Sequence, residues 1–138
     1  MPTSPSPHRW QTLSRFLVVG LVGFGVDGGV LSGLLAQGWT IVQARAVSFL
    51  AAVSLTWWLN RIWTFKGSQP NAPTREYLLY FVTQLGGALI NLLVFFALVY
   101  AVEPLKRMPL IPLAAGAAVA IAFNFSISKL VVFRRQPS

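Results

Sequence analysis

Apolar residues in this chain gather into four long runs, separated by short polar or proline-containing stretches. The runs cover residues 16–36, 44–64, 77–102 and 110–133. A run of about twenty residues, at about 1.5 Å per residue in an α-helix, spans the roughly 30 Å hydrocarbon core of a bilayer. The pattern therefore predicts an all-α integral membrane protein with four transmembrane helices.

The segments outside the runs are too short to fold separately. Residues 1–14 are predicted to be a polar tail, because prolines near its start disfavour a helix. Residues 15–135 form the predicted four-helix transmembrane domain, and residues 136–138 are a C-terminal tail. The first run is longer than the apolar region of a signal peptide, so we interpret it as a membrane span.

Composition agrees with this class. Hydrophobic residues make up 55% of the chain, charged residues only 10%, and the mean hydropathy is +0.64, whereas soluble domains average about 25% charged residues. Cysteine is absent and His8 is the single histidine, so we expect no metal, no cofactor and no enzyme activity. A net charge of +8 in so apolar a chain indicates anionic lipid headgroups rather than nucleic acid.

Basic residues predict the orientation of the helices. With four spans, both termini and the middle loop lie on one side of the membrane, and most of the Lys and Arg residues fall on that side. They are Arg9, Arg15, Arg61, Lys66, Arg75, Lys129, Arg134 and Arg135, against Arg45, Lys106 and Arg107 on the other side. The positive-inside rule therefore places both termini in the cytoplasm, and we expect the chain in the cytoplasmic (inner) membrane.

The two halves of the chain resemble each other. At an offset of 68, residues 56–65 align with residues 124–133, and both segments contain a basic residue followed by a final Phe four positions later. At an offset of 64, the first and third runs share further positions: Phe16 with Tyr80, Gly23 with Gly87 and Asp27 with Asn91. Since each half holds two spans, both halves enter from the same side. We interpret the chain as two parallel helical hairpins that arose by duplication.

Asp27 is an acidic residue in the middle of a predicted span. It follows Arg15 by twelve residues, which places it roughly 18 Å along the helix, where a carboxylate costs about 2.5–3.5 kcal/mol. Two roles are open: lining a polar cleft, or hydrogen bonding to Asn91 to hold helices together. The cleft hypothesis includes five polar residues, which are Asp27, Asn60, Asn91, Asn124 and Ser128.

Three glycines in the first run recur every fourth residue: Gly25, Gly29 and Gly33. A stripe of small residues allows close approach of another helix. We therefore predict a packing face, which serves either a neighbouring helix or a second copy of the chain, and we expect a homodimer.

Four basic residues lie at a similar depth near the predicted cytoplasmic ends of the helices: Arg15, Arg61, Arg75 and Lys129. Their charge, and the donor geometry of arginine, suit a phosphate group. The alternative is that they snorkel to the interface and only set the topology, but that role does not require the polar neighbours Asn60 and Ser128. The aromatic residues Trp63, Phe65 and Phe133 are expected at the membrane interface.

Several motifs together resemble the GtrA-like family. They lie within about residues 15–135 and are an Arg-Phe-Leu-x-x-Gly start at Arg15, the acid Asp27, Asn60-Arg61-x-Trp63-Thr64-Phe65, and Asn124-Phe125-x-x-Ser128-Lys129-x-Val131-Val132-Phe133. The resemblance implies a small four-span protein that moves polyprenyl-phosphate-linked sugars across the membrane for cell-surface polysaccharide synthesis, beside a membrane glycosyltransferase. Similar hairpins form the membrane part of some polyprenyl-phosphate sugar synthases. The family often has Asn-Phe where Thr56-Trp57 stand here, so the role of Asn124 is not carried over to Thr56.

Three functions remain open from the sequence. In lipid-sugar translocation, the basic cluster captures the phosphate, the polar cleft shelters the sugar, and the apolar tail stays in lipid. The second function is a membrane anchor or scaffold for a polyprenyl-phosphate glycosyltransferase. The third is a small proton-coupled exporter, which the intramembrane Asp27 favours and the surrounding positive charge disfavours.

Overall fold

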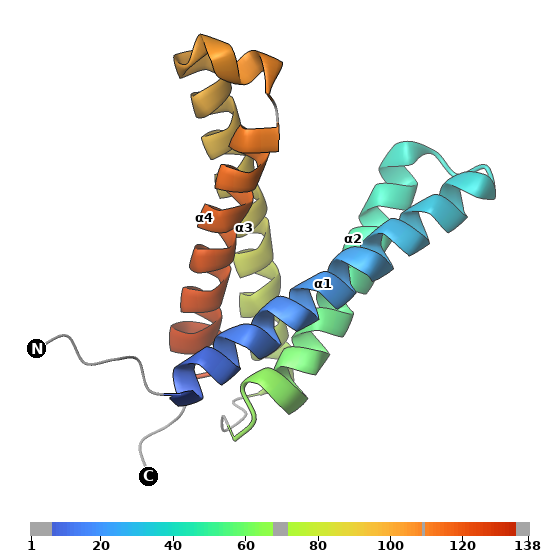
Figure 1. Cartoon of the computed structure of the whole chain (residues 1–138). Helices are drawn as coiled ribbons and strands as arrows, with labels where there is room; N and C mark the ends of the chain where they lie inside the picture. The colour runs from blue at the N-terminus through green and yellow to red at the C-terminus, as the bar shows by residue number, and fades with distance from the viewer. Residues whose placement is uncertain (1–6, 68–71, 109, 135–138) are drawn as a thin grey trace, which may run out of the picture. The chain divides into compact units, whose positions relative to one another are not determined.

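The computed structural model describes residues 7–67, 72–108 and 110–134, and this part of the chain is helical, without a strand. Its long helices are α1 (Pro7–Ala36), α2 (Ile41–Leu59), α3 (Pro73–Ala101) and α4 (Leu110–Ile127) (Figure 1). Four segments are long and apolar enough to cross a membrane: His8–Ala36, Ile41–Thr64, Pro73–Ala101 and Leu110–Val132. The predicted all-α fold with four spans is confirmed, whereas the orientation of the termini stays a prediction.

The chain divides into two compact units, and each is a helical hairpin. The N-terminal hairpin contains α1, α2 and a short turn of π-helix, η1 (Asn60–Thr64). The C-terminal hairpin contains α3, a short 3₁₀ helix η2 (Glu103–Arg107), α4 and a second π-helical turn, η3 (Ser128–Val132). In each hairpin the two long helices pack side by side. We call the end that holds the connection between them the closed end, and the other the open end.

Helix α1 begins at Pro7, well before the predicted start at residue 16. Proline is tolerated at the first position of a helix because an N–H there would have no helical partner. Within this polar extension, Thr12 and Ser14 donate their hydroxyls to the carbonyl oxygens of His8 and Trp10, at 3.0 and 2.7 Å. The rest of the predicted polar tail, and the C-terminal tail at residues 136–138, lie outside the described residues.

In each hairpin the two long helices approach closely at a glycine of the first helix. A Cβ atom at Gly23 of α1 would collide with the side-chain methyl group of Thr56 on α2, and one at Gly87 of α3 would collide with the side chain of Asn124 on α4. These pairs are related by the sequence offsets of 64 and 68 that relate the two halves. Each hairpin therefore uses the same small-residue crossing, as helices do in membranes.

Many large apolar side chains lie on the outside of the helices. Leu21 and Phe24, for example, are 71% and 79% exposed. Several polar side chains are buried instead: Ser48, Thr56, Asn60, Thr64, Glu76, Thr83 and Ser128. An apolar exterior over a partly polar interior is the arrangement that a bilayer requires, because hydrocarbon cannot satisfy polar groups.

Candidate functional site

The open end of each hairpin finishes in the same π-helical turn. In η1 the backbone N–H of Phe65 donates to the carbonyl oxygen of Asn60, and in η3 the N–H of Phe133 donates to that of Ser128, both at 2.8 Å. Such turns are rare within α-helices and are frequent at functional sites. The two segments that the sequence aligned at an offset of 68 thus share one backbone conformation.

The Phe that ends each turn is locked against the first helix of its own hairpin. The ring of Phe65 meets Phe16 edge to face, with centroids 6.2 Å apart, and Phe133 meets Tyr80 in the same way at 6.0 Å. Phe65 and Phe133, expected at the interface, are buried in these pairs, whereas the third aromatic, Trp63, is exposed. The pairs fix each π turn to the neighbouring helix.

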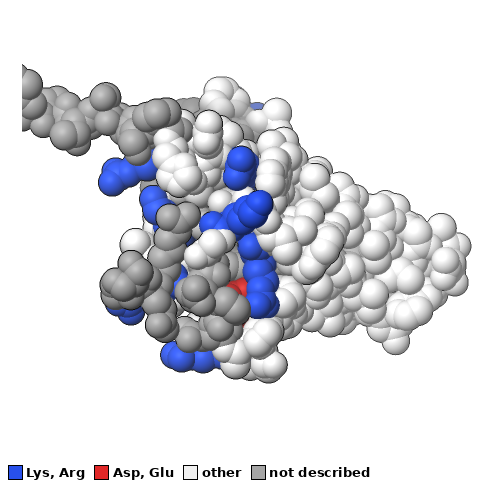
Figure 2. All heavy atoms as spheres, turned by 90° about the horizontal axis from the view of Figure 1, so that it is seen from below, with Lys and Arg blue, Asp and Glu red and all other residues white. Residues whose placement is uncertain are grey.

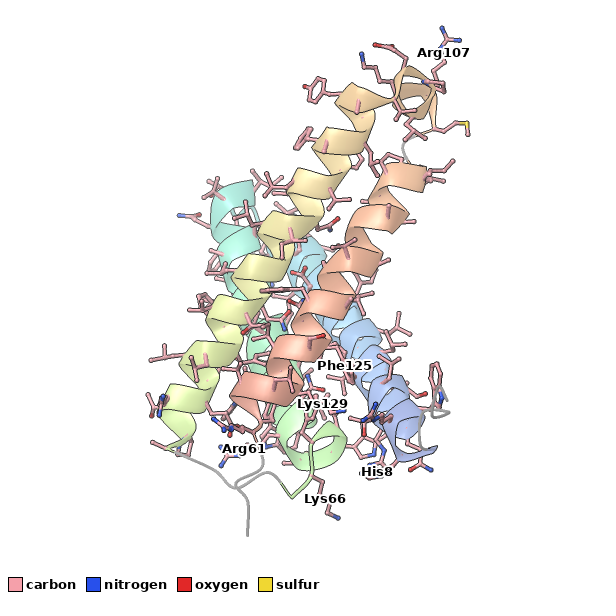
Figure 3. The ribbon with its side chains drawn as sticks, turned by 90° about the vertical axis from the view of Figure 1, so that its left-hand side faces the viewer. His8, Arg61, Lys66, Arg107, Phe125 and Lys129 are labelled. Carbon is pink, nitrogen blue, oxygen red and sulfur yellow. The ribbon has the colours of Figure 1, made fainter. Side chains whose placement is uncertain are left out.

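Each turn carries a cation above an aromatic ring. The guanidinium carbon of Arg61 lies 5.5 Å from the centroid of Trp57, and the ammonium nitrogen of Lys129 lies 5.9 Å from that of Phe125. The ring precedes the cation by four residues in both cases. Because a ring face attracts a cation, it holds each charge at a defined place at the open end of its hairpin (Figure 3).

The other two predicted phosphate ligands differ from each other. Arg15 donates from Nη1 to the carbonyl oxygen of Trp63 at 3.3 Å, and its guanidinium carbon lies 5.6 Å from the Trp63 ring centroid. Arg75 is exposed near the start of α3. Lys and Arg side chains gather around the open ends of the helices, while the helix sides seen in the same view are mostly uncharged (Figure 2).

Buried polar side chains stand next to these cations along the chain. Asn60 precedes Arg61 and Ser128 precedes Lys129, and both polar side chains are almost completely buried. The hydroxyl oxygen of Ser128 has no hydrogen-bond partner within the described residues. A buried hydroxyl without a partner lowers the stability of the folded protein. A serine at this position is therefore better explained by a functional role than by packing.

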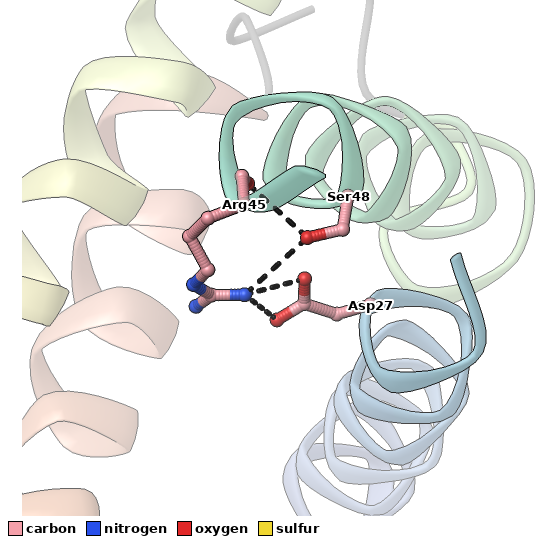
Figure 4. A network of polar contacts seen from close by, with 3 residues as sticks. All are labelled: Asp27, Arg45 and Ser48. Atoms are coloured by element: carbon pink, nitrogen blue, oxygen red, sulfur yellow. Dashed lines mark hydrogen bonds and ion pairs between the residues drawn. The ribbon is translucent and has the colours of Figure 1, made fainter. Parts of the chain in front are cut away.

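Asp27 is paired with Arg45, a residue that the sequence argument had assigned only to topology. The Nη1 atom of Arg45 lies 2.6 Å from each carboxylate oxygen of Asp27 (Figure 4). Ser48 completes the group: its hydroxyl donates to the carbonyl oxygen of Arg45 at 3.1 Å and lies 3.5 Å from the same Nη1. Asp27 therefore has a partner within its own hairpin.

The remaining members of the predicted polar cleft lie on the C-terminal hairpin. Asn124 donates from Nδ2 to Oε1 of Gln84 at 3.4 Å. Asn91 packs tightly against Gly116: a Cβ atom added at Gly116 would collide with Asn91. The expected cleft formed by all five polar residues stays a prediction.

The glycine stripe of α1 faces open space. A Cβ atom built at Gly25, Gly29 or Gly33 would meet no described atom within 4 Å. The stripe is therefore not the surface on which α2 packs, since that contact is made at Gly23. Its packing against another helix stays a prediction.

Sequence reasoning missed three partners of the candidate site, and also one buried acidic residue. Trp57 and Phe125 were aligned with each other, and their spacing of four residues before a cation was a usable signal for a cation–π pair. Arg45 was harder to find, because its backbone lies nearer the closed end than Asp27, and only a long side chain closes the gap. Glu76, buried in the first turn of α3, gave no signal.

Comparison with known proteins identifies the fold family. The family model described as GtrA/DPMS, transmembrane domain, matches residues 15–134, which include the crossings at Gly23 and Gly87 and both π turns. No curated protein matches the chain. With nearly the whole chain covered and four helices able to span a membrane, this multi-pass membrane protein belongs to the GtrA/DPMS transmembrane-domain family.

Proposed function

We propose that this protein moves a polyprenyl-phosphate-linked sugar from the cytoplasmic to the outer leaflet of the inner membrane, for cell-surface polysaccharide synthesis or modification. The observation that carries the proposal is the duplicated π turn, in which a cation stands over a ring beside a buried polar residue. Family membership supports the class of substrate. The open ends face the cytoplasm in this proposal, following the positive-inside rule.

The substrate has three parts, and the chain offers a matching surface for each. Arg61 in the N-terminal hairpin and Lys129 in the C-terminal hairpin are each suited to an anionic phosphate, because charge-assisted hydrogen bonds to phosphate are short and strong. Asp27, Asn91 and Asn124 are the polar groups for the sugar hydroxyls. The isoprenoid tail stays in lipid, against the apolar exterior of the helices.

The ring beneath each cation has a physical role in capture. It takes the place of part of the cation's hydration, so less water has to be removed when a phosphate arrives. The guanidinium of Arg61 offers a fork of two parallel donors, whereas Lys129 is a point charge with three donors. Arg61 is therefore suited to a directional contact with a phosphate, and Lys129 to a contact through charge.

The chain acts without catalysis or a cofactor in this proposal, and the consumption of the lipid-linked sugar in the outer leaflet drives net movement. A membrane glycosyltransferase is the proposed partner, which makes the substrate on the cytoplasmic side. A scaffold for that enzyme is the second candidate function, and the family description, which joins GtrA with DPMS, favours it. In that case the hairpins anchor the enzyme and transport nothing.

Proteoliposomes test the proposal directly. Purified protein is reconstituted with a short-chain polyprenyl-phosphoryl hexose, and the transfer of the hexose to the vesicle interior is followed over time. Arg61→Ala should weaken binding about tenfold or more, since a hydrogen bond to a charged group contributes about 1.5–3 kcal/mol. Arg61→Lys should recover part of the loss, because it keeps the charge and loses the fork.

Lys66→Ala is the matched control, because Lys66 is an exposed cation at the same open end but lies beyond the π turn. It should bind and transport like the wild type. We call Arg61 and Lys129 the capture site. Normal binding by folded Arg61→Ala and Lys129→Ala variants would overturn the assignment of this site. Binding without transport, together with co-purification of the glycosyltransferase, would favour the scaffold.

A further inference from the structure

The Asp27–Arg45 pair lies toward the closed end of the N-terminal hairpin, away from the capture site. Arg45 follows the start of α2 at Ile41 by four residues, or about 6 Å, whereas Asp27 precedes the end of α1 at Ala36 by nine residues, or about 14 Å. The guanidinium thus extends away from the nearer helix end, deeper into the hairpin. An arginine that only sets topology snorkels in the opposite direction, toward water.

Only one nitrogen of the Arg45 guanidinium is engaged. All of its contacts with Asp27 and Ser48 are made by Nη1 (Figure 4). Within residues 7–67, 72–108 and 110–134, no hydrogen bond or ion pair reaches Nε or Nη2, and the side chain is 53% exposed, against 21% for Asp27. The Nε–Nη2 edge is the donor pair with which arginine binds two oxygens of a phosphate.

The C-terminal hairpin shows that the fold does not require this charge pair. At the same offsets, Asp27, Arg45 and Ser48 correspond to Asn91, Leu113 and Gly116. There the helices close up instead, with Gly116 packed directly against Asn91. A charged side chain in a membrane span raises the free energy of insertion, and the C-terminal hairpin forms without this pair. We therefore infer that the pair in the N-terminal hairpin has a role beyond packing.

We propose that Arg45 is a second phosphate-binding residue, held by Asp27 and Ser48, which receives the phosphate group in the closed-end half of the membrane. Its ligand is a phosphate group, and the choice of a lipid phosphate rests on the proposed function. Asp27 competes with the ligand through charge: its carboxylate offsets the positive charge of Arg45 and repels an anion on the Nε–Nη2 edge, so that the bound phosphate is released rather than retained. The chain thus offers phosphate ligands at two depths, one on each side of the membrane centre.

Nuclear magnetic resonance of ¹⁵N-arginine-labelled full-length protein, in micelles of a phosphate-free detergent, tests this directly. The Nε–H signal of Arg45 is identified as the one that is missing in an Arg45→Lys variant. In the wild type this signal is followed while geranyl phosphate is added, and a parallel sample receives inorganic phosphate. We expect a saturable shift with geranyl phosphate. A response to geranyl phosphate alone identifies a lipid headgroup as the ligand, and an equal response to both identifies the free anion; either result supports the site. No shift with either probe overturns the proposal.

Variants separate this site from the capture site and from a structural role. Asp27→Asn should tighten geranyl phosphate binding at Arg45 several-fold, because the competing carboxylate is gone. The triple variant D27N/R45L/S48G copies the C-terminal hairpin, so it should fold and keep the response of Arg61 to geranyl phosphate, while the total binding of geranyl phosphate falls. Arg107→Leu, which removes an exposed cation at the closed end of the other hairpin (Figure 3), should change nothing.

The Arg61→Lys variant tests whether the Arg45 site is independent of the capture site. It should weaken the response of the capture site and leave the titration of the Arg45 signal intact. A normal Arg45 response with no effect of any Arg61 variant would refute the capture site and leave the present inference standing. Unchanged binding in Asp27→Asn would count against the competition, and loss of the Arg45 shift in Arg61→Lys would refute an independent second site.

Discussion

The backbone N–H of Phe65 donates to the carbonyl oxygen of Asn60, five residues earlier, at 2.8 Å, and Phe133 repeats this bond with Ser128 at the same distance. π-Helical residues make up well under 1% of residues in globular proteins. Their presence at equivalent positions in both hairpins therefore supports a duplication better than the sequence match did. The turn is the feature on which the two halves agree most closely, although most of their side chains differ.

The glycine crossings give the first prediction. Gly23→Ala should destabilise the N-terminal hairpin by about 1–3 kcal/mol, the usual cost of overpacking, because the new Cβ collides with the Thr56 methyl group. Gly87→Ala should act similarly on the C-terminal hairpin through Asn124. The measurement is the free energy of unfolding in mixed micelles, titrated with a denaturing detergent.

Two further variants control this prediction. Gly20→Ala introduces the same methyl group where no described atom lies within 4 Å, so its stability should match the wild type or exceed it slightly, since alanine favours helix. The double variant G23A/T56S removes the colliding methyl and should regain most of the loss. Equal stability of the Gly23→Ala and Gly20→Ala variants would contradict the close approach.

The ring below Arg61 gives the second prediction. Trp57→Leu should weaken binding of a polyprenyl phosphate about two- to fivefold, because a partly exposed cation–π contact contributes about 0.5–1 kcal/mol to holding the cation in place. Trp58→Leu is the matched control, since Trp58 is the adjacent residue and is 50% exposed. Ligand binding in nanodiscs is the measurement. Equal weakening by the two variants would show that the effect does not depend on the ring beneath Arg61, and would contradict the prediction.

The buried hydroxyl of Ser128 gives the third prediction. Ser128→Ala should leave the free energy of unfolding unchanged or raise it by about 1 kcal/mol, because it removes a buried group with no partner in the described structure. The same variant should bind a polyprenyl phosphate more weakly than the wild type. Thermal unfolding and binding, measured on one preparation, distinguish this from a structural role, in which stability and binding would fall together.

Much of the fold could be predicted from the sequence, because each span is long enough to cross a bilayer on its apolar residues alone. Gly23 and Gly87 were aligned as equivalent positions, but the helix crossings at these two glycines were not predicted, because the packing face was assigned to Gly25, Gly29 and Gly33. The start of α1 was placed too late, since Pro7 was interpreted as a helix breaker although it stands at the first position of the helix. The π turns were not predicted, because an i to i+5 hydrogen bond leaves no periodicity of its own in a five-residue segment.

The candidate site was less accessible to sequence reasoning. The duplicated motif singled out Arg61 and Lys129, but it could not show that Trp57 and Phe125 lie beneath them. Pairing Asp27 with Arg45 required the relative depth of two helices, together with a side-chain direction opposite to that of a snorkelling arginine. Such directions are set by tertiary packing rather than by local pattern.

Orientation gives the fourth prediction. The chain has no cysteine, so Lys66→Cys and Arg107→Cys each create a single thiol, at the open end of one hairpin and the closed end of the other. In intact cells, a membrane-impermeant maleimide should label Arg107→Cys and should label Lys66→Cys only after permeabilisation. The reverse pattern would place the open ends on the outer side of the membrane and would contradict the proposal that substrate is bound from the cytoplasm.

The last prediction concerns a second copy of the chain. The predicted homodimer uses the face of α1 that carries Gly25, Gly29 and Gly33, where the described structure leaves open space. Close approach of two helices depends on small residues, so a G25L/G29L variant should shift the protein toward monomer, whereas Phe24→Ala, at an exposed residue on another face of the same helix, should not. Single-molecule photobleaching in native-membrane nanodiscs reports the number of copies. A wild type that is monomeric throughout would refute the dimer, and a G25L/G29L variant that stays dimeric would place the interface on another face of the chain.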